Sequence, residues 1–504
     1  MISKVRSLGL GGIRGYEVSV ECYLSSGLPA FDIVGLPDAA VREARERVRA
    51  AVKNTSIKFP VSRITVNLAP ADTKKAGTIY DLPILLGILA ATGDIKPIPE
   101  DCAFFGELSL SGEVRGVPGA LPMALCAQRS GIKRLFVPAG NAVEASYATD
   151  VAIFPVSDVK EILSHLSGET EIVAAAPLEP SREMTGILDF SDIKGQDNVK
   201  RAIEVASAGG HNILLIGPPG AGKSMLAKRI PTILPDMSRD ETIESTEIHS
   251  VMGLTSSQNP ILTTRPFRSP HHTISAIAMA GGTSTPRPGE ISLSHNGVLF
   301  LDELPEFSRE VLESLRQPIE DGHVTISRAA ASITYPSQFM LVCAMNPCKC
   351  GWYGHPSGRC VCSGGALKKY IEKLSGPLLD RIDMYIEVPS LEFDELRMNQ
   401  RAESSLDIRT RVNKARELQR ARYSETGVEC NAQIGQKELS AFCPLDDACE
   451  TLMRGAYDRL GLTARSYDRI LRVARTIADL ADSERIAPVH LAEAIQYRTY
   501  SFGA

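Results

Sequence analysis

Long apolar runs are missing from this 504-residue sequence. None approaches the ~20 residues that a membrane-spanning helix needs, so no transmembrane segment is predicted. Residues 1–6 also lack the apolar stretch of a secretory signal. We therefore expect a cytoplasmic protein that has no membrane partner.

Basic residues do not outnumber acidic ones either. The formal net charge is −5, so the chain has no global field that would attract nucleic acid. Any contact with DNA has to come from local basic patches or from a channel formed by several subunits. The length exceeds what one hydrophobic core usually serves, and roughly two to four domains are expected.

The cysteines do not form the even, spaced set of a disulfide framework. There are eleven, an odd number that suits a reducing compartment, and four of them are clustered. Four thiolates so close together satisfy tetrahedral Zn²⁺, and the site would be structural because no coordination position stays open. Free thiols and an iron–sulfur cluster are the alternatives, and His355 could replace one thiolate. The cluster is Cys348, Cys350, Cys360 and Cys362.

A glycine-rich segment at 217–224 is the most informative motif present. It follows apolar residues 213–216, a predicted buried strand, and precedes residues 225–230, the predicted start of a helix. A G-x-x-x-x-G-K-[ST] pattern in this setting is a P-loop, which binds a nucleoside triphosphate through backbone N–H groups and the helix N-terminus. Lys223 should reach the β/γ-phosphates and Ser224 should hold Mg²⁺. The motif consists of Gly217, Pro218, Pro219, Gly220, Ala221, Gly222, Lys223 and Ser224.

Two other predicted strands end in polar residues that suit the same site. Residues 298–301 lead into Asp302 and Glu303. Asp302 is placed to order Mg²⁺ through water, and Glu303 to polarise the water that attacks the γ-phosphate. Residues 340–345 lead into Asn346, which either touches the γ-phosphate or the attacking water, or caps the turn that follows.

Arg381 lies between acidic residues in the segment 374–383. Two interpretations are open: an intramolecular salt bridge, or an arginine finger that reaches the γ-phosphate of a neighbouring subunit. The spacing of the residues does not decide between them.

Outside this region the residue pattern changes twice. Residues 1 to about 170 alternate strands and helices, whereas the chain after about 390 is strongly helical, most clearly over 406–422 and 467–481. Small residues and prolines at 174–181 predict a linker. The elements expected in the first region are a strand over 18–22, helices over 38–53 and 82–91, a strand over 64–68 and a hairpin within 104–117.

Together the motifs resemble those of an AAA+ ATPase of the magnesium-chelatase-like branch, and the whole chain resembles the ComM/YifB family. The resemblance implies the sensor 1 role for Asn346 and the trans-acting finger role for Arg381. It also implies the sensor 2 role for Arg465, at the start of a lid helix, where a lone arginine would otherwise be a solvated charge. The matching segments are 190–196, 217–224, 299–303, 344–347 and 376–383.

Residues 105–120 and 131–138 resemble the proteolytic domain of Lon proteases, whose chemistry needs a serine nucleophile and a lysine base. Here Asp81 stands closest to the serine position, and the residues at 120–123 include no lysine. Both halves of the dyad are missing, so we expect no peptidase activity. The domain would instead serve as a platform for assembly or DNA binding.

These resemblances imply an α/β multidomain protein. The expected parts are an inactive Lon-protease-like (S5 domain 2-like) α+β domain at 1–172, a linker at 173–188, an AAA+ P-loop core at 189–390, and a helical lid at 391–504. The lid would be similar to the C-terminal domain of magnesium chelatase.

Two inserts resemble loops that line the pore of related hexamers and grip DNA. The first, at 269–290, contains a Gly-rich excursion, and the second, at 321–335, is a predicted hairpin. Arg328 in the hairpin either contacts DNA phosphate or is an exposed arginine of a surface hairpin. His271 and His272 look like a metal pair, but no third ligand is near, which favours a packing role in the loop.

The ComM/YifB resemblance implies a hexameric, ATP- and Mg²⁺-dependent DNA motor. Such a motor would promote branch migration when incoming single-stranded DNA recombines with the chromosome during natural transformation, so single-stranded and branched DNA are the expected partners. The alternatives are a chelatase-type remodelling subunit that acts on a protein partner, and a Lon-like protease. The Lon-like region argues against the former, and the absent dyad against the latter.

Overall fold

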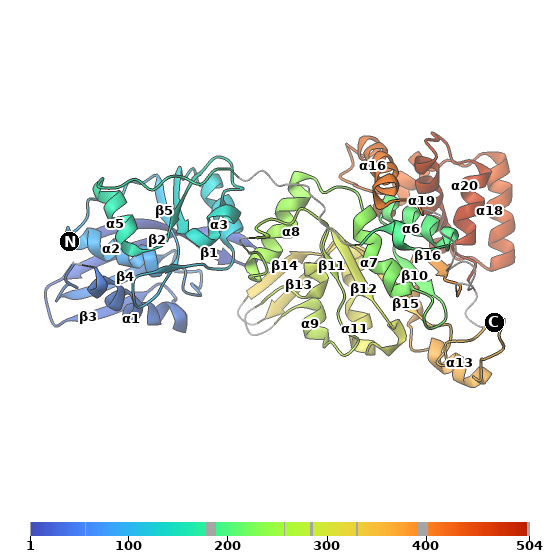
Figure 1. The fold of residues 1–504 in the computed structure, drawn as a ribbon, viewed down its shortest axis with the longest axis horizontal. Coiled ribbons are helices and arrows are strands. Elements are labelled where there is room, and N and C mark those ends of the chain that lie inside the picture. The colour runs from blue at the N-terminus through green and yellow to red at the C-terminus, as the bar shows by residue number, and fades with distance from the viewer. Residues whose placement is uncertain are drawn as a thin grey trace. The chain divides into compact units, whose positions relative to one another are not determined.

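The computed structural model describes residues 2–55, 57–177, 188–256, 258–282, 286–328, 331–390 and 402–500. The chain divides into two compact units (Figure 1). The first consists of Met1–Arg182 and Thr242–Thr263, and the second of Glu183–Glu241 and Thr264–Ala504. The chain therefore passes between the units three times. Within the described ranges, we find no helix of the length and apolarity that crossing a membrane requires.

The first unit contains a mixed seven-stranded sheet in the order β3-β4-β2-β1-β5-β8-β9. The β1–β2 and β2–β4 pairs are antiparallel, and the other four pairs are parallel. The predicted strands over 18–22 and 64–68 are confirmed, and the expected hairpin is the short pair β6–β7. The strands are β1 (Ile2–Gly11), β2 (Arg14–Ser25), β3 (Ala30–Val34), β4 (Arg63–Ala69), β5 (Cys102–Phe104), β6 (Glu107–Leu108), β7 (Val114–Arg115), β8 (Arg134–Pro138) and β9 (Ala152–Val156).

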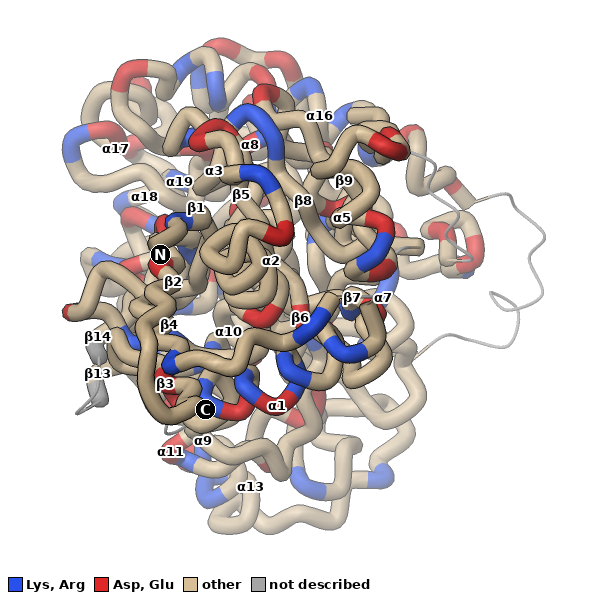
Figure 2. Tube along the Cα trace, turned by 90° about the vertical axis from the view of Figure 1, so that its left-hand side faces the viewer, with Lys and Arg blue, Asp and Glu red and all other residues tan. Residues whose placement is uncertain are grey.

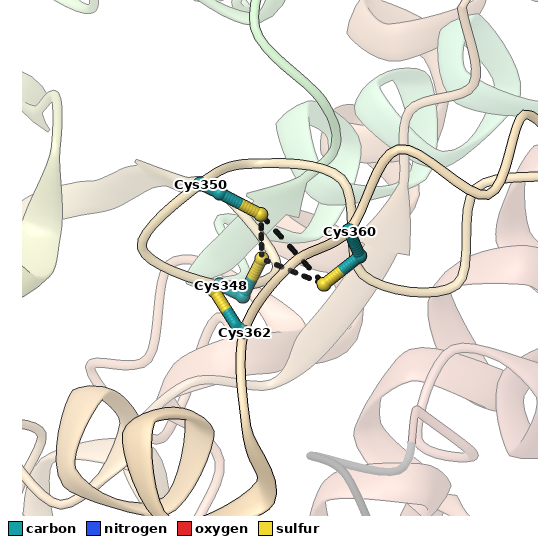
Figure 3. A group of neighbouring side chains, drawn as sticks. All are labelled: Cys348, Cys350, Cys360 and Cys362. Carbon is teal, nitrogen blue, oxygen red and sulfur yellow. Dashed lines mark hydrogen bonds between the residues drawn. The ribbon is translucent and has the colours of Figure 1, made fainter.

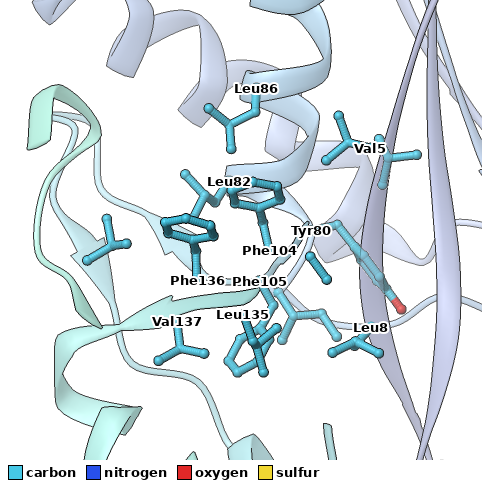
Figure 4. Packing of buried hydrophobic residues seen from close by; sticks show 14 of the residues in the cluster. Val5, Leu8, Tyr80, Leu82, Leu86, Phe104, Phe105, Leu135, Phe136 and Val137 are labelled. Carbon is cyan, nitrogen blue, oxygen red and sulfur yellow. The ribbon is translucent and has the colours of Figure 1, made fainter. Parts of the chain in front are cut away.

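Helices pack on this sheet through their apolar faces. Asp38 caps the first helix by accepting a hydrogen bond from Val41 N at 2.8 Å, and the acidic and basic residues of that helix are interspersed (Figure 2). The rings of Phe104 and Phe136 stack with centroids 4.8 Å apart, beside Leu82 of α2 (Figure 4). The helices are α1 (Ala39–Asn54), α2 (Asp81–Thr92), α3 (Ala120–Arg129), η1 (Ala139–Asn141), α4 (Ala142–Ala145) and α5 (Val159–Ser167).

Asp81, at the expected nucleophile position, is the first residue of α2 and is buried in an ion pair. Its Oδ2 lies 2.6 Å from Nε of Arg47 and accepts from Leu108 N at 3.2 Å. Burial raises the pKa of Asp81, and the Arg47 guanidinium opposes this shift. At the position expected for the nucleophile, Asp81 thus makes a structural ion pair.

The segment Thr242–Thr263 is held in the first unit by a buried carboxylate. Glu144 on α4 accepts hydrogen bonds from Leu121 N (3.0 Å), from the Ser250 hydroxyl and from Thr255 Oγ1 (3.1 Å). Burial raises the pKa of Glu144, and these donors oppose the shift. Most of helix α8 (Arg239–Val251) thus belongs to the first unit, although it begins with residues of the second.

The second unit contains a parallel five-stranded sheet in the order β11-β12-β15-β10-β16. Its central strands are apolar runs buried on both faces, as the sequence predicted for 213–216 and 298–301. All strands run the same way, so their carboxyl ends form one edge and their amino ends the opposite edge. They are β10 (Ile213–Ile216), β11 (Phe267–Arg268), β12 (Gly297–Leu301), β15 (Phe339–Met345) and β16 (Met384–Glu387).

Helices follow nearly every strand of the second unit. These are η2 (Phe190–Asp192), α6 (Asp197–Gly209), α7 (Lys223–Ile233), α9 (Ala276–Ala280), α10 (Glu290–Leu293), η3 (Leu304–Glu306), α11 (Arg309–Ser314), α12 (Arg316–Asp321), α13 (Gly364–Ile371) and α14 (Gly376–Leu379). The predicted hairpin is present as β13 (His323–Arg328) and β14 (Ala331–Pro336), which pair antiparallel.

The C-terminal part of the second unit is helical, as predicted, with α16, α18, α19 and α20 grouped together (Figure 1). The two clearest predicted helices correspond to α16 and α19. The elements are α16 (Ser405–Arg422), η4 (Asn431–Gln433), α17 (Gln436–Phe442), α18 (Asp447–Leu460), α19 (Ala464–Leu480) and α20 (Pro488–Gln496). Most of the predicted linker at 173–188 lies outside the described residues.

Candidate nucleotide site

The P-loop connects β10 to α7 at the carboxyl edge of the parallel sheet. Gly220 (φ 81°) and Gly222 (φ 87°) adopt left-handed backbone conformations that disfavour other residues. Gly222 is the N-cap of α7, whose first turn leaves backbone N–H groups without intrahelical partners. These N–H groups and the helix dipole form a setting suited to phosphate.

Lys223 is buried and lies among oxygen atoms of the loop. Its Nζ donates to the carbonyls of Gly217 (2.7 Å) and Pro218 (2.9 Å) and to Oδ1 of Asn346 (3.0 Å). Burial lowers the pKa of Lys223, and the carboxylates of Asp302 and Glu303 oppose that shift. The ammonium group is therefore held at the mouth of the loop.

The carboxylate at the end of β12 meets the first turn of α7. Ser224 Oγ donates to Asp302 Oδ2 at 2.5 Å, and Asp302 Oδ1 accepts from the backbone N–H of Glu303 at 2.9 Å. A hydroxyl and a carboxylate brought together are the oxygen ligands that Mg²⁺ takes, so the residues present fit the metal of a nucleotide complex.

Glu303 has an unusual backbone and a histidine neighbour. Its φ of 54° and ψ of 47° are left-handed, which is uncommon for a residue with a side chain. Its Oε2 lies 3.7 Å from Nδ1 of His272, and the ring of His272 lies 4.1 Å from that of His271. His272 thus packs beside the carboxylate that is predicted to orient water. The sequence pattern did not reveal this contact.

Asn346, at the end of β15, belongs to the same site. It accepts from Lys223 through its side chain and from the Tyr370 hydroxyl through its carbonyl, at 3.1 Å. Its side chain thus points at the P-loop lysine. The sensor role itself stays a prediction.

Arg381 lies at the opposite edge of the sheet. Its Nη2 is 2.5 Å from Oε1 of Glu320, and it donates to the carbonyls of Arg316 (3.1 Å) and Pro377 (2.6 Å). The salt-bridge interpretation therefore has a partner, Glu320, that is not one of the flanking acids. Within its own chain, Arg381 stands at the amino edge, away from the P-loop edge.

Arg381 and Arg465 line one cavity of about 640 Å³ at that amino edge. Arg465, in the first turn of α19, lies 3.6 Å from Asp380, and its side chain is 68% exposed. The cavity is also lined by residues at the starts of β10, β12, β15 and β16, and by four further arginines: Arg265, Arg416, Arg469 and Arg472. Arg381, the predicted finger, and Arg465, the predicted sensor 2 arginine, thus line the same cavity, whose wall carries acidic as well as basic side chains.

The four clustered cysteines lie within reach of a single metal ion (Figure 3). Their sulfur atoms are all within 4.8 Å of one another, and they form the one such group found among the described residues. The Cys348–Cys350, Cys348–Cys360 and Cys350–Cys360 sulfur pairs are 3.3, 3.8 and 3.7 Å apart. Tetrahedral Zn²⁺ with Zn–S bonds of 2.3 Å requires an edge of about 3.8 Å, so the cluster fits zinc.

The thiols of the cluster titrate differently, because burial and the neighbouring thiols raise the pKa of Cys360 to about 11 and also raise that of Cys362. Backbone N–H groups of Trp352 and Val361, with the Cys348 thiol, lower the pKa of Cys350 to about 6. His355, considered above as a substitute ligand, instead contacts Ser357 Oγ through Nδ1 at 2.7 Å. The geometry of the cluster therefore favours four sulfur ligands.

Arg328 ends β13, and its side chain lies outside the described residues. The part of the first insert that is described includes α9, the first residue of α10 and a bridge between Gly281 and Pro288. The proposed DNA contacts of both inserts stay predictions.

Known proteins are similar to this chain along nearly its whole length. Competence protein ComM of Haemophilus influenzae is 44% identical over 499 residues, which is 97% of this chain and 95% of ComM. The chain belongs to the ComM/YifB family. YifB of Escherichia coli, described as uncharacterized, is 42% identical over 500 residues, 99% of this chain and 97% of YifB.

Three family models named for the ChlI subunit of magnesium chelatase match consecutive parts of this ComM/YifB family member. They cover residues 20–141, 189–396 and, with the C-terminal model, 402–498. Because one of these models matches residues 20–141, the N-terminal region does not set the chain apart from magnesium chelatases. A Lon protease of Brucella suis is 25% identical over 176 residues, 32% of this chain and 22% of that protein.

Three residues at the site escaped the sequence interpretation. Gln196 Nε2 donates to the P-loop carbonyl of Ala221 at 3.0 Å, Tyr370 holds Asn346, and His272 stands beside Glu303. Gln196 lies in the segment 190–196, which resembles the family, but the sequence assigned no role to this residue. Tyr370 had no local signal, and the sequence pattern favoured only a packing role for His272 in its loop, because the contacts of both connect distant parts of the chain.

Proposed function

We propose that the chain hydrolyses ATP at the carboxyl edge of its parallel sheet. The observation that carries the proposal is the hydrogen-bonded set of Lys223, Ser224, Asp302 and Asn346, contributed by three adjacent strands. Lys223 would exchange loop carbonyls for the β/γ-phosphates, and Ser224 and Asp302 would hold Mg²⁺, which neutralises charge on the phosphates. Glu303 would orient the attacking water, and Asn346 would contact the γ-phosphate.

The second half of the site comes, in this proposal, from another subunit. Arg381 and Arg465 share a cavity at the edge opposite the P-loop, so neither is placed to reach the nucleotide of its own chain. In a ring, the amino edge of one subunit would meet the P-loop edge of the next. To act as a finger, Arg381 would exchange Glu320, which is 54% exposed, for the γ-phosphate.

We further propose that ATP hydrolysis drives a hexameric DNA motor that promotes branch migration during natural transformation. The full-length relation to a protein named for competence supports this function. Arg328 and the insert at 269–290 are the proposed DNA contacts. Because the net charge is negative, the DNA-binding surface would be local to such loops.

A chelatase-type remodelling subunit is the second candidate, favoured by the ChlI family models. ATPase activity measured with single-stranded DNA, with branched DNA and without DNA tests both functions, with Lys223→Ala as the inactive control. We expect either DNA to raise the turnover of the wild type and not of the variant. An ATPase that ignores both DNAs and responds only to a protein partner would overturn the DNA motor in favour of the remodelling subunit.

A further inference from the structure

The loop that carries the cysteines packs directly against the P-loop. Gly351 has a left-handed backbone (φ 85°), and a Cβ at this position would lie 2.5 Å from Cδ and 2.6 Å from Cγ of Pro219. Because the proline ring is rigid, it cannot move aside as a flexible side chain would. The contact leaves no room for even one methyl group.

The same loop also borders Asn346. Cys348 follows Asn346 by two residues and is fully buried. A Cβ placed on Gly351 would lie 3.8 Å from Cγ of Asn346. Asn346 in turn accepts from Lys223. A change in the loop is therefore transmitted to the P-loop and to its lysine by direct contact.

The loop that carries the cysteines has no regular secondary structure. No helix or strand is present between residues 346 and 363, all of which the structure describes, and nearby order comes from turns such as Gly351 N to Cys348 O at 2.9 Å. The sulfur atoms converge from both ends of the loop (Figure 3). A metal ion bound by these ligands would supply order that no helix or strand supplies in this segment.

We propose that the Cys348–Cys362 loop, folded around a thiolate-bound zinc ion, holds the P-loop in its nucleotide-binding shape, so that zinc occupancy controls ATP affinity. This inference rests on the proposed nucleotide site. It assigns the cluster a role in binding that goes beyond stabilising the fold.

Gly351→Ala tests the contact, and Gly354→Ala is its matched control. Gly354 lies in the same loop with φ 75°, but nothing stands within 4 Å of its Cβ position. Both variants thus place a side chain at a left-handed φ, and only the first meets Pro219. With a fluorescent ATP analogue and Mg²⁺, we expect about ten- to hundredfold weaker binding for Gly351→Ala and little change for Gly354→Ala. Equal affinities in the two variants would overturn the proposal.

Pro219→Ala provides a second test, because it removes the two ring atoms that a Cβ at residue 351 would meet. The double variant Pro219→Ala/Gly351→Ala should bind the analogue about as tightly as Pro219→Ala alone. If Gly351→Ala weakens binding equally in both backgrounds, the effect does not pass through Pro219, and the proposal is wrong.

Removal of the metal from the full-length wild type tests the same link without a substitution. Metal analysis should give about one zinc ion per chain. Chelation should weaken binding of the analogue, and added Zn²⁺ should restore it. Unchanged affinity after zinc loss, or a chain that purifies and binds the analogue without metal, overturns the inference. Failure of the proposed function is distinguishable, since wild type and Lys223→Ala would then bind the analogue equally poorly.

Discussion

Glu303 occupies a position where backbone and side chain are both constrained. Its left-handed φ follows directly from the end of β12, and its backbone N–H is tied to Asp302. This places a carboxylate beside the P-loop while leaving its side chain 62% exposed. Such a group can reach a water molecule without leaving the sheet edge.

We predict that Glu303→Gln removes turnover and keeps nucleotide binding. The amide preserves the shape of the side chain and loses the charge that polarises water, so kcat should fall by about 10²–10⁴-fold. Steady-state ATPase assays and equilibrium binding of an ATP analogue measure the two effects separately. Loss of binding together with turnover would contradict the assigned role.

His272 should act through Glu303. Its Nδ1 is 3.7 Å from the carboxylate, whereas Nδ1 of His271 contacts Thr273 Oγ1 at 2.9 Å. We expect His272→Ala to lower kcat by about tenfold with KM for ATP unchanged, because a misplaced carboxylate orients water poorly. His271→Ala is the matched control. In the Glu303→Gln background, His272→Ala should add nothing, and an additive loss would rule out this route.

At the scale of elements, helix α8 carries a carboxylate whose ionisation opposes folding. Burial raises the pKa of Glu247 to about 7 from an ordinary value of 4.5, with Arg129 and Arg14 opposing the shift and Glu244 adding to it. The unfolded chain ionises this group near its ordinary value. The wild type therefore loses stability as the pH rises between these two values, and the loss is complete above pH 7.

Glu247→Gln should remove that loss. At pH 8 we expect the free energy of unfolding of the variant to exceed that of the wild type by at most about 3 kcal/mol, so the variant should melt at a higher temperature. This difference in stability should shrink toward pH 5. Thermal melting of the full chain at both pH values measures this, and Glu244→Gln, at an exposed position of the same helix, is the control. A difference that is equal at both pH values would show that ionisation is not its cause.

The elements that could be predicted from sequence are those whose signal is local. The buried runs of β10 and β12, the P-loop, and the helices α1, α16 and α19 follow from periodicity, capping and motif spacing. The partner of Arg381 could not be predicted, because Glu320 lies 61 residues away along the chain. The same holds for His272 and Gly351, which are defined by contacts across the fold.

At the scale of the whole molecule, the proposed ring makes turnover a joint property of two subunits. A Lys223→Ala subunit lacks its own P-loop lysine but still offers Arg381, and an Arg381→Ala subunit has the opposite defect. Mixing the two should therefore restore ATPase activity above that of either alone, since a finger is worth about 10³–10⁵-fold in turnover.

The control for this mixture is Arg381→Ala combined with the double variant Lys223→Ala/Arg381→Ala, which offers no finger to any P-loop. We expect no recovery in that pair. Recovery there, or none in the first mixture although mixed oligomers form, would assign Arg381 to its salt bridge with Glu320 alone.

Because Thr242–Thr263 belongs to the first unit, no single truncation point separates the two units. A fragment that ends at residue 182 leaves the buried Glu144 without Ser250 and Thr255. A fragment that starts at residue 183 keeps the apolar side chain of Ile261 without the core that covers it. Neither cut separates the units cleanly, so the inactivity of such fragments would report a broken fold, and point substitutions are the sounder way to assign roles.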